Sequence, residues 1–171
     1  MTPRSRRAPD LKMRALTWLA QREHSASELR TKLLRLAQRS AEDTADAADE
    51  AQEGGNAQDA SAQVDALLVW LQERGYLSEE RFVASRLHTR ASRWGERRIS
   101  QELAQHGLEL DTQQRAELRA TELDRARALW QRKFGTPPQD ERERARQLRF
   151  MAARGFEPGL LQRLWREAAE G

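Results

Sequence analysis

The sequence contains no cysteine, and this absence excludes several classes of protein at once. A disulfide framework, thiolate catalysis and cysteine-ligated zinc all require that residue, and a chain without it suits a reducing compartment. No apolar run approaches the ~20 residues that a membrane-spanning helix needs. The basic stretch MTPRSRRAPD is not followed by the apolar segment of a signal peptide. We therefore expect a cytoplasmic protein with no membrane partner.

The motifs of catalytic sites are missing as well. His24, His88 and His106 stand alone, without the carboxylate or second histidine that a metal site combines. The sequence has no phosphate-binding Gly-x-x-x-x-Gly-Lys loop, no Gly-x-Ser-x-Gly turn and no paired carboxylates in an apolar stretch. Glu and Arg instead alternate at helical spacing, as in ERERARQ, which is typical of a solvated helix face. We expect no enzymatic activity, no metal and no other cofactor.

Hydrophobic residues are too few for one large spherical core. They make up 38% of the 171 residues and charged residues 33%, a balance that favours an elongated body. Seven acids and no base lie between residues 40 and 63. Because the whole chain has a net charge of +3, the chain without this segment carries +10. Such a basic body predicts a polyanionic or acidic partner.

Apolar residues recur at helical spacing throughout the chain, and alternating strand patterns are almost absent. Ser25, with Glu28 three residues later, has the spacing of a capping box, and Ser78 is placed to begin another helix. Gly75 and Gly107 follow apolar stripes, where a left-handed residue ends a helix. The pattern predicts an all-α protein of short helices, each too small to fold alone.

A motif near the helix ends occurs three times. The stretches WLAQREH, WLQERGY and FMAARGF begin at Trp18, Trp70 and Phe150 and place an arginine four residues after the aromatic. Short helices that repeat in this way bury their apolar faces against their neighbours. We therefore predict an elongated array of three tandem three-helix repeats.

The helical pattern also divides the chain. The expected parts are a basic flexible N-terminal tail at 1–10, a first repeat at 11–77, the start of a second repeat at 78–110, a long helix closing it at 111–134, and a third repeat at 139–171. The first repeat contains the acidic low-complexity insertion at 40–63. We expect this insertion to be a mobile loop, although its composition also allows a marginal helix up to Gly54 and Gly55.

Arginine supplies almost all of the positive charge in two dense segments. The candidate partner- or DNA-binding residues are Arg81, Arg86, Arg90, Arg93, Arg97 and Arg98 in the first, and Arg125, Arg127, Arg132 and Lys133 in the second. Guanidinium groups suit bidentate contact with carboxylate or phosphate. Arginine is also common in GC-rich coding, so two interpretations stay open at this point: a basic binding ridge that turns a corner at Gly95, and a solvated face.

The tryptophans favour a core more than a binding surface. Four of the five lie on apolar stripes at helical spacing, which already explains them. Trp94 is the exception because it stands beside Gly95, where we expect the helix that follows Ser78 to end.

Three stretches together resemble the RecX family of RecA regulators. GYLSEERF, followed by Arg86, Arg90 and GERRISQELAQHGL, resembles the middle of that family, ALTWLAQREHSASELRTKL its first repeat and ARGFEPGLLQRLW its last. Ser78 stands where the family usually has Asp or Asn, which exchanges one N-cap residue for another. The acidic insertion is longer and more acidic than the family's usual connection.

The resemblance implies a helical modulator that lies in the groove of the RecA filament on single-stranded DNA. So placed, it would inhibit ATP hydrolysis, strand exchange and the coprotease activity that triggers the SOS response, and thereby modulate recombination and DNA repair. We expect a monomer with weak, salt-dependent affinity for single- or double-stranded DNA. Two alternatives remain: a helix-turn-helix protein that binds duplex phosphates without RecA, and a structural helical scaffold.

Overall fold

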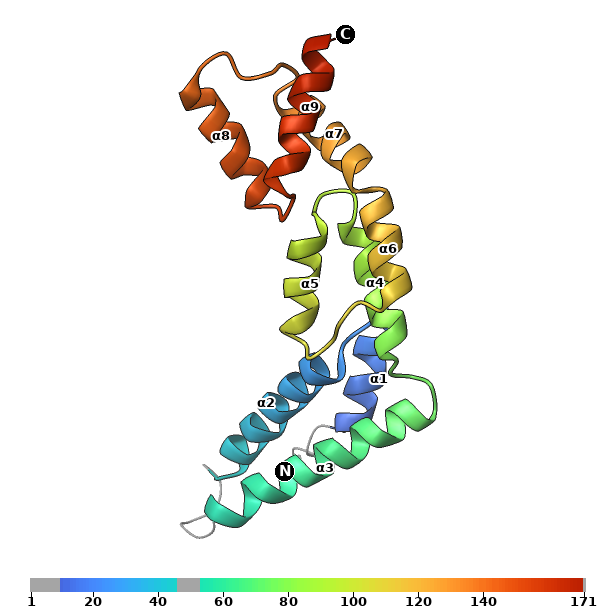
Figure 1. Cartoon of the computed structure of the whole chain (residues 1–171). Coiled ribbons are helices and arrows are strands. Elements are labelled where there is room, and N and C mark those ends of the chain that lie inside the picture. The colour runs from blue at the N-terminus through green and yellow to red at the C-terminus, as the bar shows by residue number, and fades with distance from the viewer. Residues whose placement is uncertain (1–9, 46–52, 171) are drawn as a thin grey trace. The chain divides into compact units, whose positions relative to one another are not determined.

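The computed structural model describes residues 10–45 and 53–170, with side chains over 10–40 and 58–170. All regular structure in these residues is helical, which confirms the predicted all-α class (Figure 1). The chain divides into two compact units, Met1–Phe82 and Val83–Gly171. No helix in the described residues combines the length and the apolar character needed to cross a membrane.

The first unit contains α1 (Leu11–Gln21), α2 (Ala26–Ala45) and α3 (Glu53–Glu73). The Asp10 carboxylate caps α1, and Ser25 Oγ accepts the N–H of Glu28 at 3.1 Å, as expected of an N-cap. The three helices enclose one core, and burial stabilises the fold by roughly 2 kcal/mol for each leucine. Its buried members are Ala15, Leu29, Leu33, Val64, Leu68, Leu71 and Leu77.

The prediction of a loop over the acidic insertion is wrong at both of its ends. Helix α2 continues to Ala45, and α3 begins at Glu53 and includes Gly54 and Gly55. The many alanines of this segment favour helix, which offsets the lack of an apolar stripe. Residues 46–52 and the tail at 1–9 lie outside the described residues, so the expectations for them remain predictions.

Helix α4 (Glu79–Arg90) begins at the end of the first unit and continues into the second. Ser78 Oγ accepts the N–H of Arg81 at 3.2 Å, which confirms this serine as an N-cap. The helix ends at Arg90, not at Gly95 as the apolar spacing suggested. Gly95 instead precedes α5 (Glu96–Ala104) as its N-cap residue.

The predicted long helix over residues 111–134 is two helices, α6 (Thr112–Ala120) and α7 (Glu122–Lys133). Asp111 and Gln114 form a capping box at the start of α6. Helix α6 packs against α5, whereas α7 packs against α9. The chain breaks at Thr121 because each short helix buries its apolar stripe in a different bundle, so α7 opens the last bundle and does not close the second.

The last bundle consists of α7, α8 (Glu141–Ala152) and α9 (Pro158–Glu170). Its buried core is formed by Ala126, Leu129, Trp130, Met151, Phe156, Leu161, Leu164 and Trp165. The indole N–H groups of Trp130 and Trp165 both donate to the buried Gln147 Oε1, at 2.7 and 2.8 Å. Both tryptophans therefore belong to the core, as their spacing predicted, and their polar atoms are satisfied inside it.

Candidate basic interaction surface

Arg81, the first of the predicted binding residues, braces a turn. Its guanidinium donates to the Glu23 carboxylate at 2.8 Å and to the carbonyl oxygens of Gly75 and Tyr76 at 2.9 and 3.0 Å. These bonds tie the turn after α3 to the start of α4. They use the Nε and Nη2 donors of this exposed side chain.

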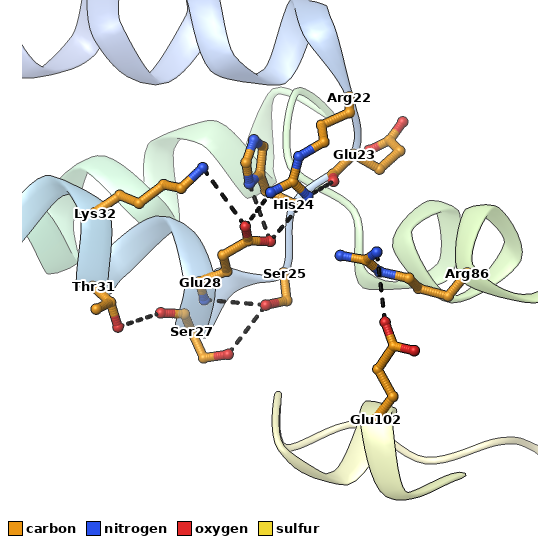
Figure 2. A network of polar contacts seen from close by, with 10 residues as sticks. All are labelled: Arg22, Glu23, His24, Ser25, Ser27, Glu28, Thr31, Lys32, Arg86 and Glu102. Atoms are coloured by element: carbon orange, nitrogen blue, oxygen red, sulfur yellow. Dashed lines mark hydrogen bonds and ion pairs between the residues drawn. The ribbon is translucent and has the colours of Figure 1, made fainter. Parts of the chain in front are cut away.

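Arg86 and Arg90 converge on one carboxylate. The Glu102 side chain on α5 lies 3.5 Å from Arg86 Nη1 (Figure 2). It also lies 3.4 Å from Arg90 Nε. Arg90 Nε is buried and forms no hydrogen bond with any described residue, because the ion pair lacks hydrogen-bond geometry. These two ion pairs therefore link α4 to α5.

The corner between α4 and α5 carries three exposed arginines of this group. Arg93 and Arg97 are exposed and form no ion pair with any residue in 10–40 or 58–170. Arg98 is also exposed, and its guanidinium lies 4.7 Å from the ring centre of the half-buried Trp94. The structure thus brings together three cations that no carboxylate of the described residues neutralises.

A shallow cavity lies beside this corner. Its volume is about 280 Å³, and it is lined by Arg90, Trp94, Arg98, Gln101, Glu102, Gln105 and His106. Every lining residue comes from the end of α4, from α5 or from the turns that follow these two helices. The cavity is therefore a feature of the second unit alone, with cations, amides and one indole at its wall.

Arg125 differs from the other candidates because its guanidinium is built into the fold. It donates to the carbonyl oxygens of Ala91, Trp94 and Leu118 at 2.6 to 2.7 Å. Burial lowers the pKa of Arg125, and the nearby Glu122 carboxylate partly opposes the shift. These bonds attach the end of α4 and the end of α6 to α7. Arg125 therefore holds in place the helix ends that carry the exposed arginines, and is not itself one of those exposed residues.

The other three candidates of the second segment differ in whether a carboxylate pairs with them. Arg127 pairs with Asp124 and with Glu167, at 2.6 and 2.7 Å. Arg132 is exposed and forms no ion pair within the described part of the chain. Lys133 lies 5.8 Å from the ring centre of Phe150, on α8.

Two further cations join Lys133, and neither was selected from the sequence as a site residue. Arg154 lies 3.6 Å from the ring centre of Phe150, and Arg146 lies 5.5 Å from that of Phe134. The two phenylalanine rings meet edge to face at 5.1 Å. Two sequence signals did concern this cluster: the threefold motif contains Phe150 and Arg154, and the second arginine segment contains Lys133.

Glu122 is another residue that the sequence analysis did not identify. Its buried carboxylate accepts the N–H of Glu96 at 3.0 Å and so caps the start of α5. Burial raises the pKa of Glu122, and the N–H of Glu96 opposes this shift. The Glu96 side chain in turn pairs with Arg115 and Arg119 at 3.4 and 2.7 Å. The start of α5 is therefore fixed by ion pairs.

His24 is not isolated, contrary to the sequence analysis. The imidazole is buried, and its Nδ1 lies 3.2 Å from Glu28, which also pairs with Arg22 and Lys32 (Figure 2). Burial lowers the pKa of His24, with Glu28 opposing the shift. The pKa of Glu28 is lowered. Burial alone would raise it, but the hydrogen bond from Arg22 and the nearby positive charges have the larger combined effect. No group of three or more metal-ligating side chains occurs in the described residues.

Comparison with known protein families finds a match for each of the last two helical bundles. A family model described as "RecX, second three-helix domain" matches residues 78–120, and one described as "RecX, third three-helix domain" matches residues 120–165. The boundary between the two matches coincides with the break between α6 and α7.

Curated relatives match most of the chain. "Regulatory protein RecX" of Ralstonia pickettii is 42% identical over 164 residues, which cover 95% of this chain and 90% of the relative. Its namesake from Leptothrix cholodnii is 45% identical and covers 92% of this chain and 88% of the relative. The protein of that name from Pseudomonas putida is 39% identical, with coverage of 88% and 85%.

Proposed function

The chain belongs to the RecX family of regulatory proteins, and from this premise we propose that it binds the RecA filament on single-stranded DNA and inhibits it. The inhibited activities are ATP hydrolysis, strand exchange and coprotease action, so the protein modulates recombination, DNA repair and the SOS response. The observation that carries the proposal is the corner of α4 and α5, where Arg93, Arg97 and Arg98 are exposed without a neutralising carboxylate among the described residues.

This corner suits a partner that presents a regular array of negative charge. A guanidinium can form two parallel hydrogen bonds with a carboxylate or a phosphate. Such pairs are worth ~1.5 kcal/mol or more when an interface brings them close. A RecA filament offers acidic protein side chains and DNA phosphates at every repeat, and three-helix bundles arranged in series can contact successive repeats.

We further propose that the protein acts by binding and not by catalysis, and that it works as a monomer in the cytoplasm, where the proposed partner acts. The relatives' description as regulatory proteins supports a non-enzymatic role. The proposed contact residues are the exposed cations of the candidate set, whereas the guanidinium of Arg125 holds the segment after α4 in place from inside the fold.

RecA's DNA-dependent ATPase provides the direct test. We expect the chain to lower the steady-state rate of ATP hydrolysis by RecA on single-stranded DNA, and the inhibition to weaken as salt rises. Unchanged hydrolysis at saturating protein would contradict the proposal. Tight binding to naked duplex together with unchanged hydrolysis would favour the helix-turn-helix alternative.

A further inference from the structure

Two groups can be distinguished among the cations of the second unit according to their neighbours. One group bonds to carboxylates or backbone carbonyls: Arg86, Arg90, Arg115, Arg119, Arg125, Arg127 and Arg163. The other lies over aromatic rings and forms no ion pair with any residue that the structure describes: Arg98, Lys133, Arg144, Arg146 and Arg154. Within this group Arg154 Nη1 also donates to the Phe150 carbonyl oxygen at 3.2 Å, one turn earlier on α8. Charges in the second group remain available to an anion, with an aromatic ring beside each of them.

The cavity beside Trp94 has the chemistry of a nucleotide subsite. Its volume of about 280 Å³ is near the lower end of the range for small-ligand pockets. Arg90 and Arg98 supply donors for a phosphate, and the Trp94 indole supplies an aromatic surface on which a base can stack. Gln101 and Gln105 provide amides that both donate and accept, as the edge of a base requires.

The acidic group in the cavity wall does not oppose this assignment. Glu102 lies within 3.5 Å of a nitrogen of each of two guanidiniums, Arg86 and Arg90. One carboxylate facing two cations leaves the local charge positive. An incoming phosphate therefore meets net attraction at this wall.

A second aromatic and cationic cluster adjoins the cavity through the backbone. It consists of Phe134, Phe150, Lys133, Arg146 and Arg154, described above. The Arg154 carbonyl accepts the Gly95 N–H at 2.8 Å, and a Cβ on Gly155 would lie 2.6 Å from Arg98 Cβ. Figure 1 shows the end of α8 beside the start of α5. The turn that carries Arg154 and Gly155 therefore lies directly against Arg98, which lines the cavity.

We propose that the Trp94–Arg98 cavity and the adjoining Phe150–Arg154 cluster together form a binding site for single-stranded nucleic acid, with bases stacked on the aromatic side chains and phosphates held by the arginines. The site deepens the proposed function and rests on it for its biological setting, the single-stranded DNA of the filament. It lies wholly within the second unit.

The stacking surfaces distinguish this ligand from duplex and from acidic peptide. Bases of a duplex are stacked on each other and expose only their edges, so an aromatic ring gains nothing from them. An acidic peptide would satisfy the arginines but has no planar group for the indole of Trp94 or the ring of Phe150. Each nucleotide of a single strand supplies both a planar base for an aromatic ring and a phosphate for an arginine.

The test uses the full chain without RecA and a fluorescently labelled oligothymidylate of ~20 nucleotides at low salt. We expect the dissociation constant to rise roughly tenfold for Trp94→Ala, because one stacked base is lost, and to be partly restored in Trp94→Phe. Arg98→Gln with Arg154→Gln should weaken binding by about tenfold or more. An abasic strand of equal length, which keeps the phosphates, should bind wild type at least as weakly as oligothymidylate binds Trp94→Ala, because it loses stacking on both Trp94 and Phe150.

Matched controls decide the outcome. Arg163→Gln with Arg166→Gln removes the same charge from α9 and should change the dissociation constant less than twofold, with circular dichroism reporting the fold of each variant. Equal losses in both arginine doubles, or equal affinity for the abasic strand and oligothymidylate, would overturn the proposal. If wild type inhibits RecA yet does not bind oligothymidylate, the proposed site is wrong while the proposed function stands. If wild type binds oligothymidylate yet does not inhibit RecA, the site stands while the proposed function is wrong.

Discussion

The backbone N–H of Gly95 donates a 2.8 Å hydrogen bond to the carbonyl oxygen of Arg154. The bond connects the start of α5, in the second bundle, to the turn after α8, in the third. There is no room for a side chain at this contact, because a Cβ on Gly95 would overlap the carbonyl group of Gly155. Gly155 itself has a φ of +80°, which glycine adopts at no steric cost. The two bundles are thus joined backbone to backbone.

Gly95→Ala should therefore destabilise the second unit. The added methyl meets backbone, which cannot rotate away, so we expect a loss of about 2 kcal/mol in the free energy of unfolding. Gly159→Ala is the matched control, since nothing lies within 4 Å of a Cβ there, and it should be neutral or up to about 1 kcal/mol stabilising. Urea unfolding of the two variants measures the difference. Equal stability would show that the bundles move apart without cost.

Arg125→Met should destabilise the second unit through the carbonyl groups that it abandons. The guanidinium satisfies the oxygens of Ala91, Trp94 and Leu118, and methionine of similar length satisfies none. We expect a loss of about 2–4 kcal/mol by urea unfolding. Arg132→Met, at an exposed position nearby on α7, should cost less than about 0.5 kcal/mol. A small effect at Arg125 would mean that water replaces the guanidinium.

Local contacts could be predicted from the sequence, whereas contacts between distant residues could not. The N-caps Ser25 and Ser78 were predicted correctly, because a cap and the N–H group that it accepts lie within three residues. The brace at Arg125 was not predicted, because two of its acceptors are 31 and 34 residues away. Glu122 was missed for the same reason, since the N–H that it caps is 26 residues distant.

The same difference between local and long-range contacts explains why the sequence could not separate exposed arginines from ion-paired ones. Helical spacing located the exposed arginines at the corner of α4 and α5, since it depends only on neighbouring turns. Whether an arginine is neutralised depends on a carboxylate from another helix, as Glu102 on α5 neutralises Arg86 on α4. The same holds for the pairing of Lys133 with Phe150, which requires the fold of the third bundle.

The buried His24 should make folding stability depend on pH. Its pKa is lowered in the folded state from the ordinary value of 6.5, mainly by burial, so the folded chain binds the proton less readily than the unfolded chain. The resulting stability is present above pH 6.5 and is lost as the pH falls below that value, by at most about 1.4 kcal/mol per pH unit. Urea unfolding at about one pH unit on either side of 6.5 measures this slope.

His24→Gln should flatten the slope because it removes the titrating group while keeping a polar side chain beside Glu28. His88→Gln is the control, since His88 is exposed and its replacement should leave the slope unchanged. The charged neighbours of His24, which are Arg22, Glu28 and Lys32, are the same in both variants. Identical slopes in His24→Gln and wild type would assign the pH dependence to another group.

Charge reversal at Arg97 and Arg98 separates binding from folding. Both side chains are exposed, and the contact of Arg98 with the Trp94 ring is weak, so the double change to Glu should cost about 1 kcal/mol or less in thermal or urea unfolding. The same variant should lose most of its inhibition of RecA's DNA-dependent ATPase, because repulsion replaces attraction at the corner of α4 and α5. Arg142→Glu with Arg166→Glu makes the same change in net charge on α8 and α9, and should keep most of the inhibition. If both doubles inhibit as wild type does, the arginine corner is a solvated face; if both fail equally, net charge and not this corner governs the encounter with the filament.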